Sequence, residues 1–314
     1  MNNVEPKGRT RLLRTALLLL VIACLVWLFG FRGNAQEADR QGTSAILWMV
    51  RRWRATDENL TLGWIIPLVS LFALWQKRND LRAAPASVYG GGLVVVVLSL
   101  LLHWVGLRSQ LTRLSLLALI GLLWGIPSYL WGRSVARILV FPCAYLLFCI
   151  PLSFLNNLTV PLRILASSVS VGLLNGLGIS AVRQGTAVFS SAGGGFNFDV
   201  ADACSGLRSL LAMAAVTAAY AHFTQRTLVR KWILFLATVP LALIGNVARI
   251  VTVGVVAATC SRDAALGVYH TFSGFIIFAV AILLMMAVGS VLNLPLTERL
   301  AAWRSPVSGP TSRS

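Results

Sequence analysis

The sequence predicts an all-α polytopic integral membrane protein, with about eight transmembrane helices and a small hairpin segment at the outer face. Three observations lead to this fold class. Hydrophobic residues make up 57% of the 314 residues and charged residues only 12%, against about 25% charged residues in soluble domains. Apolar runs close to the length of a spanning helix, about 20 residues, recur along the chain. The basic residues lie mostly in short clusters between these runs.

The apolar runs define eight expected spans in chain order. The first follows a basic head, and we expect it to stay as an uncleaved helix because no clear small-x-small cleavage site follows it. The second is the shortest. The spans are expected at residues 15–31, 61–75, 86–107, 111–131, 135–155, 204–222, 232–257 and 265–290.

Two segments between the spans have a different character. Residues 32–60 alternate tryptophan and arginine in "ILWMVRRWRATDEN", which is typical of a helix at the level of the lipid headgroups. Residues 156–203 begin as an amphipathic or re-entrant segment and end in β-branched and aromatic residues around a glycine-rich turn, which predicts a small hairpin. The expected layout is a basic cytoplasmic amino terminus (1–14), an amino-terminal bundle of about five spans (15–155), the outer-face segment (156–203), a core of three spans (204–290) and a cytoplasmic tail (291–314).

Charge counting orients this layout. With the amino terminus in the cytoplasm, the inner segments hold 15 basic and 3 acidic residues, and the outer segments hold 10 basic and 7 acidic residues. An excess of Lys and Arg on the cytoplasmic side is the usual bias. Both termini are therefore expected in the cytoplasm, and "DVADACSGLRSL" at the outer face of the membrane.

Composition also excludes several classes of function. The net charge of +17 is compatible with nucleic-acid binding, but no zinc-finger spacing or other nucleic-acid motif occurs, so no nucleic-acid partner is expected. The five cysteines are scattered, with no C-x-x-C pair. This indicates neither a metal site nor a disulfide framework. No organic cofactor is implied.

Cys204 is the first candidate functional residue. It stands at an expected helix start, and Arg208 follows four residues later. The helix dipole and the arginine both lower the pKa of a thiol and favour the nucleophilic thiolate. Asp202 is close to the expected N-cap position, where capping alone is the simpler explanation for it.

Arg249 and His270 complete the candidate site. An arginine inside a span costs about 2.5–3.5 kcal/mol on insertion scales and usually marks function or an internal partner. Asn246 lies three residues earlier on the same face, although Arg249 could instead snorkel to the headgroups. His270 begins the last expected span, so the topology brings it toward Arg249. Cysteine, arginine and histidine together fit acyl transfer: the thiolate attacks a carbonyl, the guanidinium stabilises the oxyanion and the imidazole protonates the leaving amine.

These residues resemble the exosortases, bacterial relatives of the archaeosortases. The resemblance runs through "FPCAYLLFCIPLSFL", "GLGISAVRQGTAVF", "FDVADACSGLRSL", "GNVARI" and "YHTFSGF". It implies a membrane-embedded cysteine protease or transpeptidase that cuts PEP-type carboxy-terminal sorting signals of membrane-anchored proteins, in association with exopolysaccharide biosynthesis. Cys204, Arg249 and His270 take the catalytic positions. Asp202 stands where the family commonly has glutamate, and Ser205 is counted with the supporting residues.

Recognition and the competing functions stay open at this point. A carboxylate in the sorting motif needs a cation beside the nucleophile, and Arg208 is expected to supply it; Arg208→Ala should then weaken substrate use more than thiol reactivity. The alternatives are a transporter, with Arg249 in its substrate path, and a non-catalytic scaffold of a polysaccharide export system. A transporter often shows repeats or broken helices in matching halves, and the sequence has neither. Hydrolysis and transfer are not separated by the sequence.

Overall fold

The computed structural model describes residues 16, 19–32, 35–37, 40–54, 61–85, 87–150, 155–190, 197–199, 206–259 and 270–293. The chain divides into two compact units, Met1–Leu158 and Thr159–Ser314. We describe each unit by itself.

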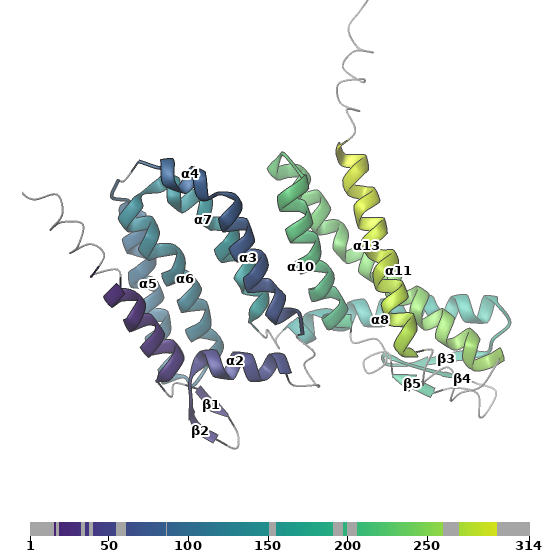
Figure 1. Ribbon diagram of the computed structural model, residues 1–314. Coiled ribbons are helices and arrows are strands. Elements are labelled where there is room, and N and C mark those ends of the chain that lie inside the picture. The colour runs from purple at the N-terminus through teal and green to yellow at the C-terminus, as the bar shows by residue number, and fades with distance from the viewer. Residues whose placement is uncertain are drawn as a thin grey trace, which may run out of the picture. The chain divides into compact units, whose positions relative to one another are not determined.

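The first unit is a bundle of helices with a short two-stranded ribbon (Figure 1). Its first described helix runs from Leu19 and ends in a π-helical turn. The elements are η1 (Trp27–Phe31), β1 (Ala35–Glu37), β2 (Arg40–Thr43), α2 (Ala45–Arg54), η2 (Thr61–Trp64), α3 (Ile65–Gln76), α4 (Arg78–Ala83), α5 (Gly90–Arg108), α6 (Thr112–Trp131), α7 (Arg133–Tyr145) and η3 (Leu146–Cys149).

The antiparallel pair of α5 and α6 forms the centre of this unit. The two helices approach so closely that a Cβ atom at position 92 would overlap the backbone of Tyr129. Gly92 therefore permits the contact, as small residues do between membrane helices. Hydrogen bonds tie the neighbouring helices to the pair and to each other. Trp124 Nε1 on α6 donates to the Ala136 carbonyl of α7 at 2.9 Å, and Ser70 Oγ on α3 donates to the Pro142 carbonyl of α7 at 2.9 Å.

Helix α2 turns its tryptophans inward. Trp48 and Trp53 are each 5% exposed, and Trp53 Nε1 donates to the Cys149 carbonyl at 2.9 Å. The guanidinium groups of Arg52 and Arg113 lie 5.3 and 5.9 Å from the Trp48 ring centroid. These contacts combine cation–π attraction with packing, so α2 is anchored to the bundle by aromatic residues while its arginines stay near the surface.

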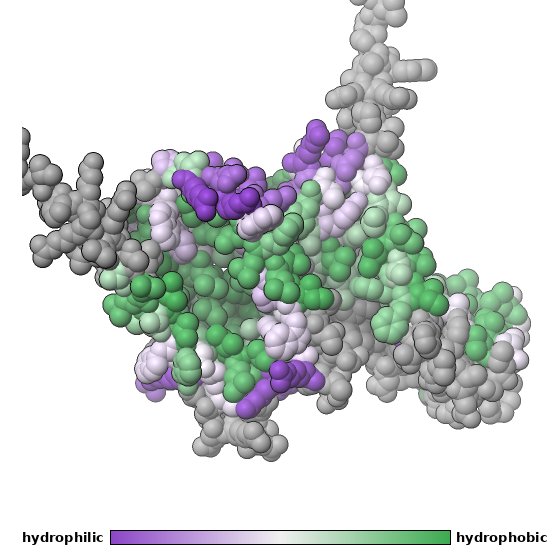
Figure 2. Space-filling model, in the orientation of Figure 1, coloured by the Kyte–Doolittle hydropathy of each residue, from purple (hydrophilic) through white to green (hydrophobic). Residues whose placement is uncertain are grey.

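The surface of the first unit has a hydrophobic band between two hydrophilic ends. Figure 2 shows hydrophilic side chains over α4 and again over α2, with hydrophobic surface between them. Along α5, side chains such as Val94 (57%), Leu98 (58%) and Leu101 (55%) are exposed. A continuous apolar band of this kind suits contact with lipid tails rather than water.

The described part of the second unit contains four helices and a three-stranded sheet. Its elements are α8 (Leu155–Gly176), which begins just before the boundary, β3 (Ala181–Gln184), β4 (Ala187–Ser190), β5 (Asn197–Asp199), α10 (Gly206–Thr224), α11 (Leu228–Thr259) and α13 (His270–Asn293). Helices α10, α11 and α13 enclose a core of Met213, Ala221, Leu234, Ala281 and Met285. Gln225 Nε2, just after α10, donates to the Gly289 carbonyl of α13 at 3.1 Å.

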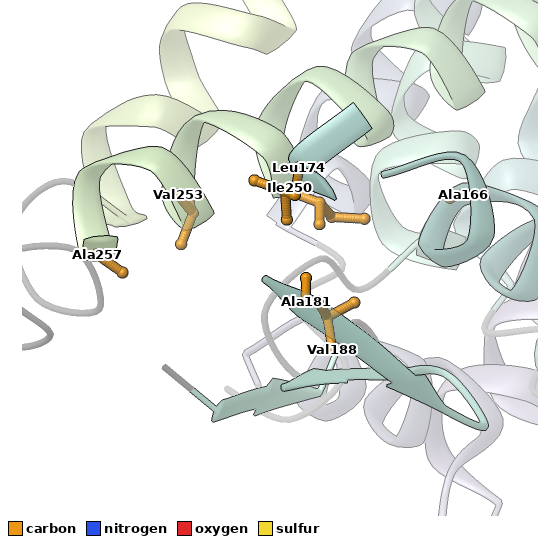
Figure 3. Packing of buried hydrophobic residues seen from close by; sticks show 7 residues of the cluster. All are labelled: Ala166, Leu174, Ala181, Val188, Ile250, Val253 and Ala257. Carbon is orange, nitrogen blue, oxygen red and sulfur yellow. The ribbon is translucent and has the colours of Figure 1, made fainter. Parts of the chain in front are cut away.

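The predicted hairpin is a three-stranded antiparallel sheet in the order β3-β4-β5. Its inner face packs on α8 and α11 through Ala181, Val188, Leu174, Ile250 and Val253 (Figure 3). Asn175, near the end of α8, holds the first strand: its Oδ1 accepts from the Ala181 N–H at 2.7 Å, and its Nδ2 donates to the Ala181 carbonyl at 3.0 Å. The side chain thus supplies both backbone groups of Ala181 with a partner at the point where the helix gives way to the sheet.

The helices agree with part of the predicted span set. Within the described ranges, four helices are long and apolar enough to cross a membrane: Gly90–Arg108, Thr112–Trp131, Leu228–Thr259 and Gly274–Asn293. Shorter apolar helices occupy Leu19–Phe31, Ile65–Gln76 and Leu210–Thr224. The protein is thus largely helical with candidate membrane spans, and the count of eight is not confirmed.

The span expected at 135–155 differs most from the structure. Helix α7 has 13 residues and passes into the 3₁₀ turn η3. At 1.5 Å per residue, α7 rises about 20 Å, which is short of the roughly 30 Å of a hydrocarbon core. The apolar run continues past the point where the α-helix ends, and this continuation made the expected span too long.

Candidate active site

Arg249 lies half-buried on α11, where that helix meets α13. Its guanidinium packs against the backbone of Gly274: a Cβ atom at position 274 would lie 3.1 Å from Nη2 and 3.3 Å from Cζ. Any larger residue would have to push the guanidinium aside. A cavity of about 70 Å³ opens at this contact, and it is lined by Met213, Ala242, Gly245, Asn246, Arg249, Gly274, Ile277, Phe278 and Ala281. Helices α10, α11 and α13 thus line one small cavity, and the guanidinium of Arg249 lies at its wall.

The face of α13 that meets this cavity is also the face that carries position 270. His270 is the first residue of α13, and Gly274, Ile277 and Ala281 follow it at spacings of 4, 7 and 11 residues. Residues at such spacings share one side of an α-helix. The backbone therefore places His270 one turn from the glycine that touches Arg249, while its side chain lies outside the described residues.

The cysteine segment joins the sheet to α10. Strand β5 ends at Asp199, which is paired with Ala187 of β4, and α10 begins at Gly206. Cys204, Asp202 and Ser205 fall between these two points and lie outside the described residues. Arg208 belongs to the first turn of α10, but its side chain is not among those described. The end of β5 and the start of α10 thus fix the two ends of the segment.

Asn246 connects the Arg249 cavity with a second, smaller one. The second cavity, of about 20 Å³, is lined by Thr159, Leu162, Arg163, Leu210, Val239, Ala242, Leu243 and Asn246. Asn246 and Ala242 line both cavities. Arginines from two helices, Arg163 of α8 and Arg249 of α11, therefore stand on either side of one asparagine.

The electrostatics of this region are those of a cation in apolar surroundings. Among the side chains that the structure describes in the second unit, none is acidic. A guanidinium in a low-dielectric cavity binds negative charge more strongly than it would in water. The Arg249 cavity can thus stabilise an oxyanion or hold a carboxylate.

Two of the seven candidate residues, Arg249 and Asn246, are placed with their side chains, and the cavity brings them together. Sequence reasoning missed Gly274 and Arg163. Gly274 lies four residues after His270 on the helix face that meets Arg249, and no sequence signal marks it, because its contact with Arg249 arises only from helix packing. Arg163 lies in an amphipathic stretch, where a charged residue is the ordinary pattern of a polar face.

No cluster of three or more His, Cys, Asp or Glu side chains suited to a metal ion occurs among the described residues. Three of the five cysteines are described, and all three are free: Cys24 is exposed, and Cys143 and Cys149 are buried.

Comparison with known protein families assigns the chain to one of them. A family described as transmembrane exosortase matches residues 52–287, about three quarters of the 314-residue chain. The chain belongs to this family. The match includes the cysteine segment, Arg249 and His270, and it ends within α13. No curated protein and no solved structure matches the chain. The protein is an exosortase-family membrane protein, which agrees with the resemblance in the sequence motifs.

Proposed function

We propose that the protein is a membrane-embedded cysteine transpeptidase that cleaves carboxy-terminal sorting signals of exported, membrane-anchored proteins. The observation that carries the proposal is the contact of the Arg249 guanidinium with Gly274, one helical turn from His270, beside a cavity that α10 also lines. Membership of the exosortase family supports the same activity.

The position of the cysteine supports the assignment of Cys204 as the nucleophile. Cys204 precedes the start of α10 by two residues, and two residues of extended chain reach at most about 7 Å. Met213, which lines the Arg249 cavity, lies seven residues into α10, or about 10 Å of helix rise. These spans are short enough to bring a thiol at the start of α10 to a peptide bound at the cavity.

The proposed chemistry assigns one task to each residue. The Cys204 thiolate adds to the carbonyl carbon of the scissile peptide bond, and the developing oxyanion is stabilised by Arg249. His270 donates a proton to the leaving amine as the C–N bond breaks, which leaves an acyl thioester on Cys204. Water or an amine or hydroxyl acceptor then attacks the thioester and releases the thiolate. Asn246 orients the guanidinium, and Asp202, Ser205 and Arg208 support the cysteine segment or the substrate.

Location and pathway form part of the same proposal. The active site faces the outer side of the inner membrane, and both termini are cytoplasmic, because basic residues favour the inner segments. The substrates carry PEP-type signals, and the processed proteins belong with exopolysaccharide and envelope biogenesis.

A processing assay in cells tests the proposal. A tagged reporter with a PEP-type signal, a transmembrane helix and a basic tail is co-expressed with the wild type and with Cys204→Ala. We expect the wild type to shorten the reporter and release it from the membrane, and Cys204→Ala to reduce processing by at least about 10³-fold, since no other thiol replaces the nucleophile.

Cys143→Ala is the matched control, because this buried cysteine belongs to the first unit. Processing that survives Cys204→Ala at the wild-type rate would exclude Cys204 as the nucleophile. If a well-expressed wild type leaves signals from the same genome uncut, the sorting activity itself is wrong.

A further inference from the structure

Arg163 is a cationic residue in the same unit as the candidate site. It stands on α8 and lines the 20 Å³ cavity together with Leu210 of α10 and Asn246 of α11. Leu210 lies four residues into α10, about 6 Å of helix rise from the helix start. Arg163 therefore lies close to the end of the cysteine segment and shares Asn246 with the Arg249 cavity.

Arg163 has no partner among the residues that the structure describes. Its Nε is buried without a hydrogen bond, and its side chain makes no ion pair with any described residue. The walls of its cavity are largely apolar, with Leu162, Val239 and Leu243 among them. A buried guanidinium nitrogen without a hydrogen bond is unfavourable, and an anion bound at this cavity would supply the missing partner.

The residues that line the cavity indicate which anion fits. Arg163 is the only charged residue among them, and Thr159 and Asn246 are the only other polar ones. A single planar guanidinium pairs with the two oxygens of a carboxylate. The cavity walls come from three helices, which suits a charged side chain of an extended peptide that lies along them. A peptide carboxylate therefore fits better than a lipid.

We propose that Arg163 binds a carboxylate of the substrate peptide and thereby positions the scissile bond beside Arg249. This inference rests on the proposed function and adds a recognition residue that the sequence motifs do not contain. Arg163 forms a two-point charge-assisted bond with the carboxylate, as the planar guanidinium favours. Arg163 then holds the peptide at the smaller cavity, and Arg249 acts on the oxyanion at the other cavity that Asn246 lines.

The test is a charge exchange between enzyme and substrate. Arg163→Ala and Arg163→Glu are combined with reporters in which each acidic residue of the PEP-type signal is changed in turn to glutamine or to lysine. We expect Arg163→Ala to slow processing of the unaltered reporter about 10- to 100-fold, the usual worth of a charge-assisted hydrogen bond. With one of the glutamine reporters it should cause no further loss, because the pair is already broken. Arg163→Glu should regain activity on the matching lysine reporter.

Arg183→Ala is the matched control for loss of a charge in the same unit. Arg183 is exposed on β3 and donates to the Gly185 carbonyl of its own turn at 2.7 Å, so its loss should leave processing near the wild-type rate. If Arg163→Ala lowers processing of every reporter by the same factor, or of none, the arginine does not recognise a carboxylate and the inference is wrong.

A binding measurement separates this inference from the proposed function. Cys204→Ala protein in lipid nanodiscs is incubated with the same purified reporters, and the retained fraction is measured with and without Arg163→Glu. Charge-dependent retention supports recognition by Arg163 even if no reporter is ever cleaved, which would count against the transpeptidase alone. If the retained fraction is the same with and without Arg163→Glu, the inference is overturned even if cleavage depends on Cys204.

Discussion

At the scale of single residues, the contact between Arg249 and Gly274 sets the geometry of the candidate site. The guanidinium occupies the space that a side chain at position 274 would need. Catalytic groups must be held closely, since a misplacement of about 1 Å can cost 10²-fold in rate. The absence of a side chain at position 274 is therefore as relevant to the site as the charge at position 249.

We expect Gly274→Ala to slow processing about three- to tenfold without loss of stability. A methyl group 3.1 Å from Nη2 forces the guanidinium to shift by a few tenths of an ångström, which should cost only part of the 10²-fold loss that a full ångström can cause. Alanine also favours the helix over glycine by roughly 0.5–1 kcal/mol, so the thermal unfolding midpoint should not fall.

Gly172→Ala on α8 is the control for this substitution, because no atom lies within 4 Å of a Cβ atom at that position. It gains the same helix propensity and touches nothing, so it should process the reporter at the wild-type rate. An equal rate for Gly274→Ala would mean that the position of the Arg249 guanidinium does not limit the reaction.

At the scale of elements, the sheet and α8 fix the position at which the chain enters the cysteine segment. Asn175 supplies both backbone groups of Ala181 with partners, and Ala181 is 4% exposed. The register then passes from β3 through β4 to β5, which ends five residues before Cys204. We therefore expect a disturbance at Asn175 to pass along the sheet to the segment that contains Cys204.

Asn175→Ala should destabilise this unit by about 1–3 kcal/mol, because it leaves the buried N–H and carbonyl of Ala181 without partners. Hydrogen exchange at the Ala181 amide and the unfolding midpoint measure the effect, and processing should slow in parallel. Asn293→Ala, at the exposed end of α13, is the control. Unchanged exchange at Ala181 in the Asn175 variant would show that the two side-chain bonds do not hold the strand.

Hydropathy predicts where apolar helices lie, but it does not predict every helix end or strand. Long apolar runs predicted α5 and α6 closely, since a membrane-spanning helix is mainly a matter of length and apolarity. The same runs did not reveal the end of α7, because Leu146–Cys149 stay apolar while the backbone changes to a 3₁₀ turn. The predicted hairpin had two arms around its glycine-rich turn, and the division of the first arm into β3 and β4 was missed, because only Gly185, with a φ of 62°, marks the turn between them.

The same difference applies to the candidate site. Arg249 was predictable because a charge within a span is costly wherever it occurs. Gly274 was not, because its importance arises only where α13 meets α11. Arg163 resembled an ordinary polar-face residue of an amphipathic helix until its cavity, with walls from two other helices, was visible. Sequence reasoning thus pointed to the candidate groups by their chemistry, and the packing between helices added Gly274 and Arg163.

At the scale of the whole molecule, the charged segments predict which turns face which side of the membrane. In the first unit, α4 carries Lys77, Arg78 and Arg82 at one end, and α2 lies at the other end, beyond the hydrophobic band (Figure 2). In the second unit, the sheet precedes the start of α10, and Arg226 follows its end. From the positive-inside bias we expect α4 and Arg226 in the cytoplasm, and the sheet and the α5–α6 turn outside.

Labelling of introduced cysteines with a membrane-impermeant maleimide tests this arrangement. We expect Ser109→Cys and Gln184→Cys to react in intact spheroplasts, and Asn79→Cys and Arg226→Cys to react only after permeabilisation, relative to the parent protein. All four positions are exposed, so access depends on the side of the membrane and not on burial. If Gln184→Cys and Arg226→Cys react from the same side, α10 does not cross the membrane. If the whole pattern is reversed, Cys204 faces the cytoplasm, where it could not reach the exported part of a membrane-anchored substrate. The sorting role would then have to be abandoned, even though the chemistry of the site remained possible.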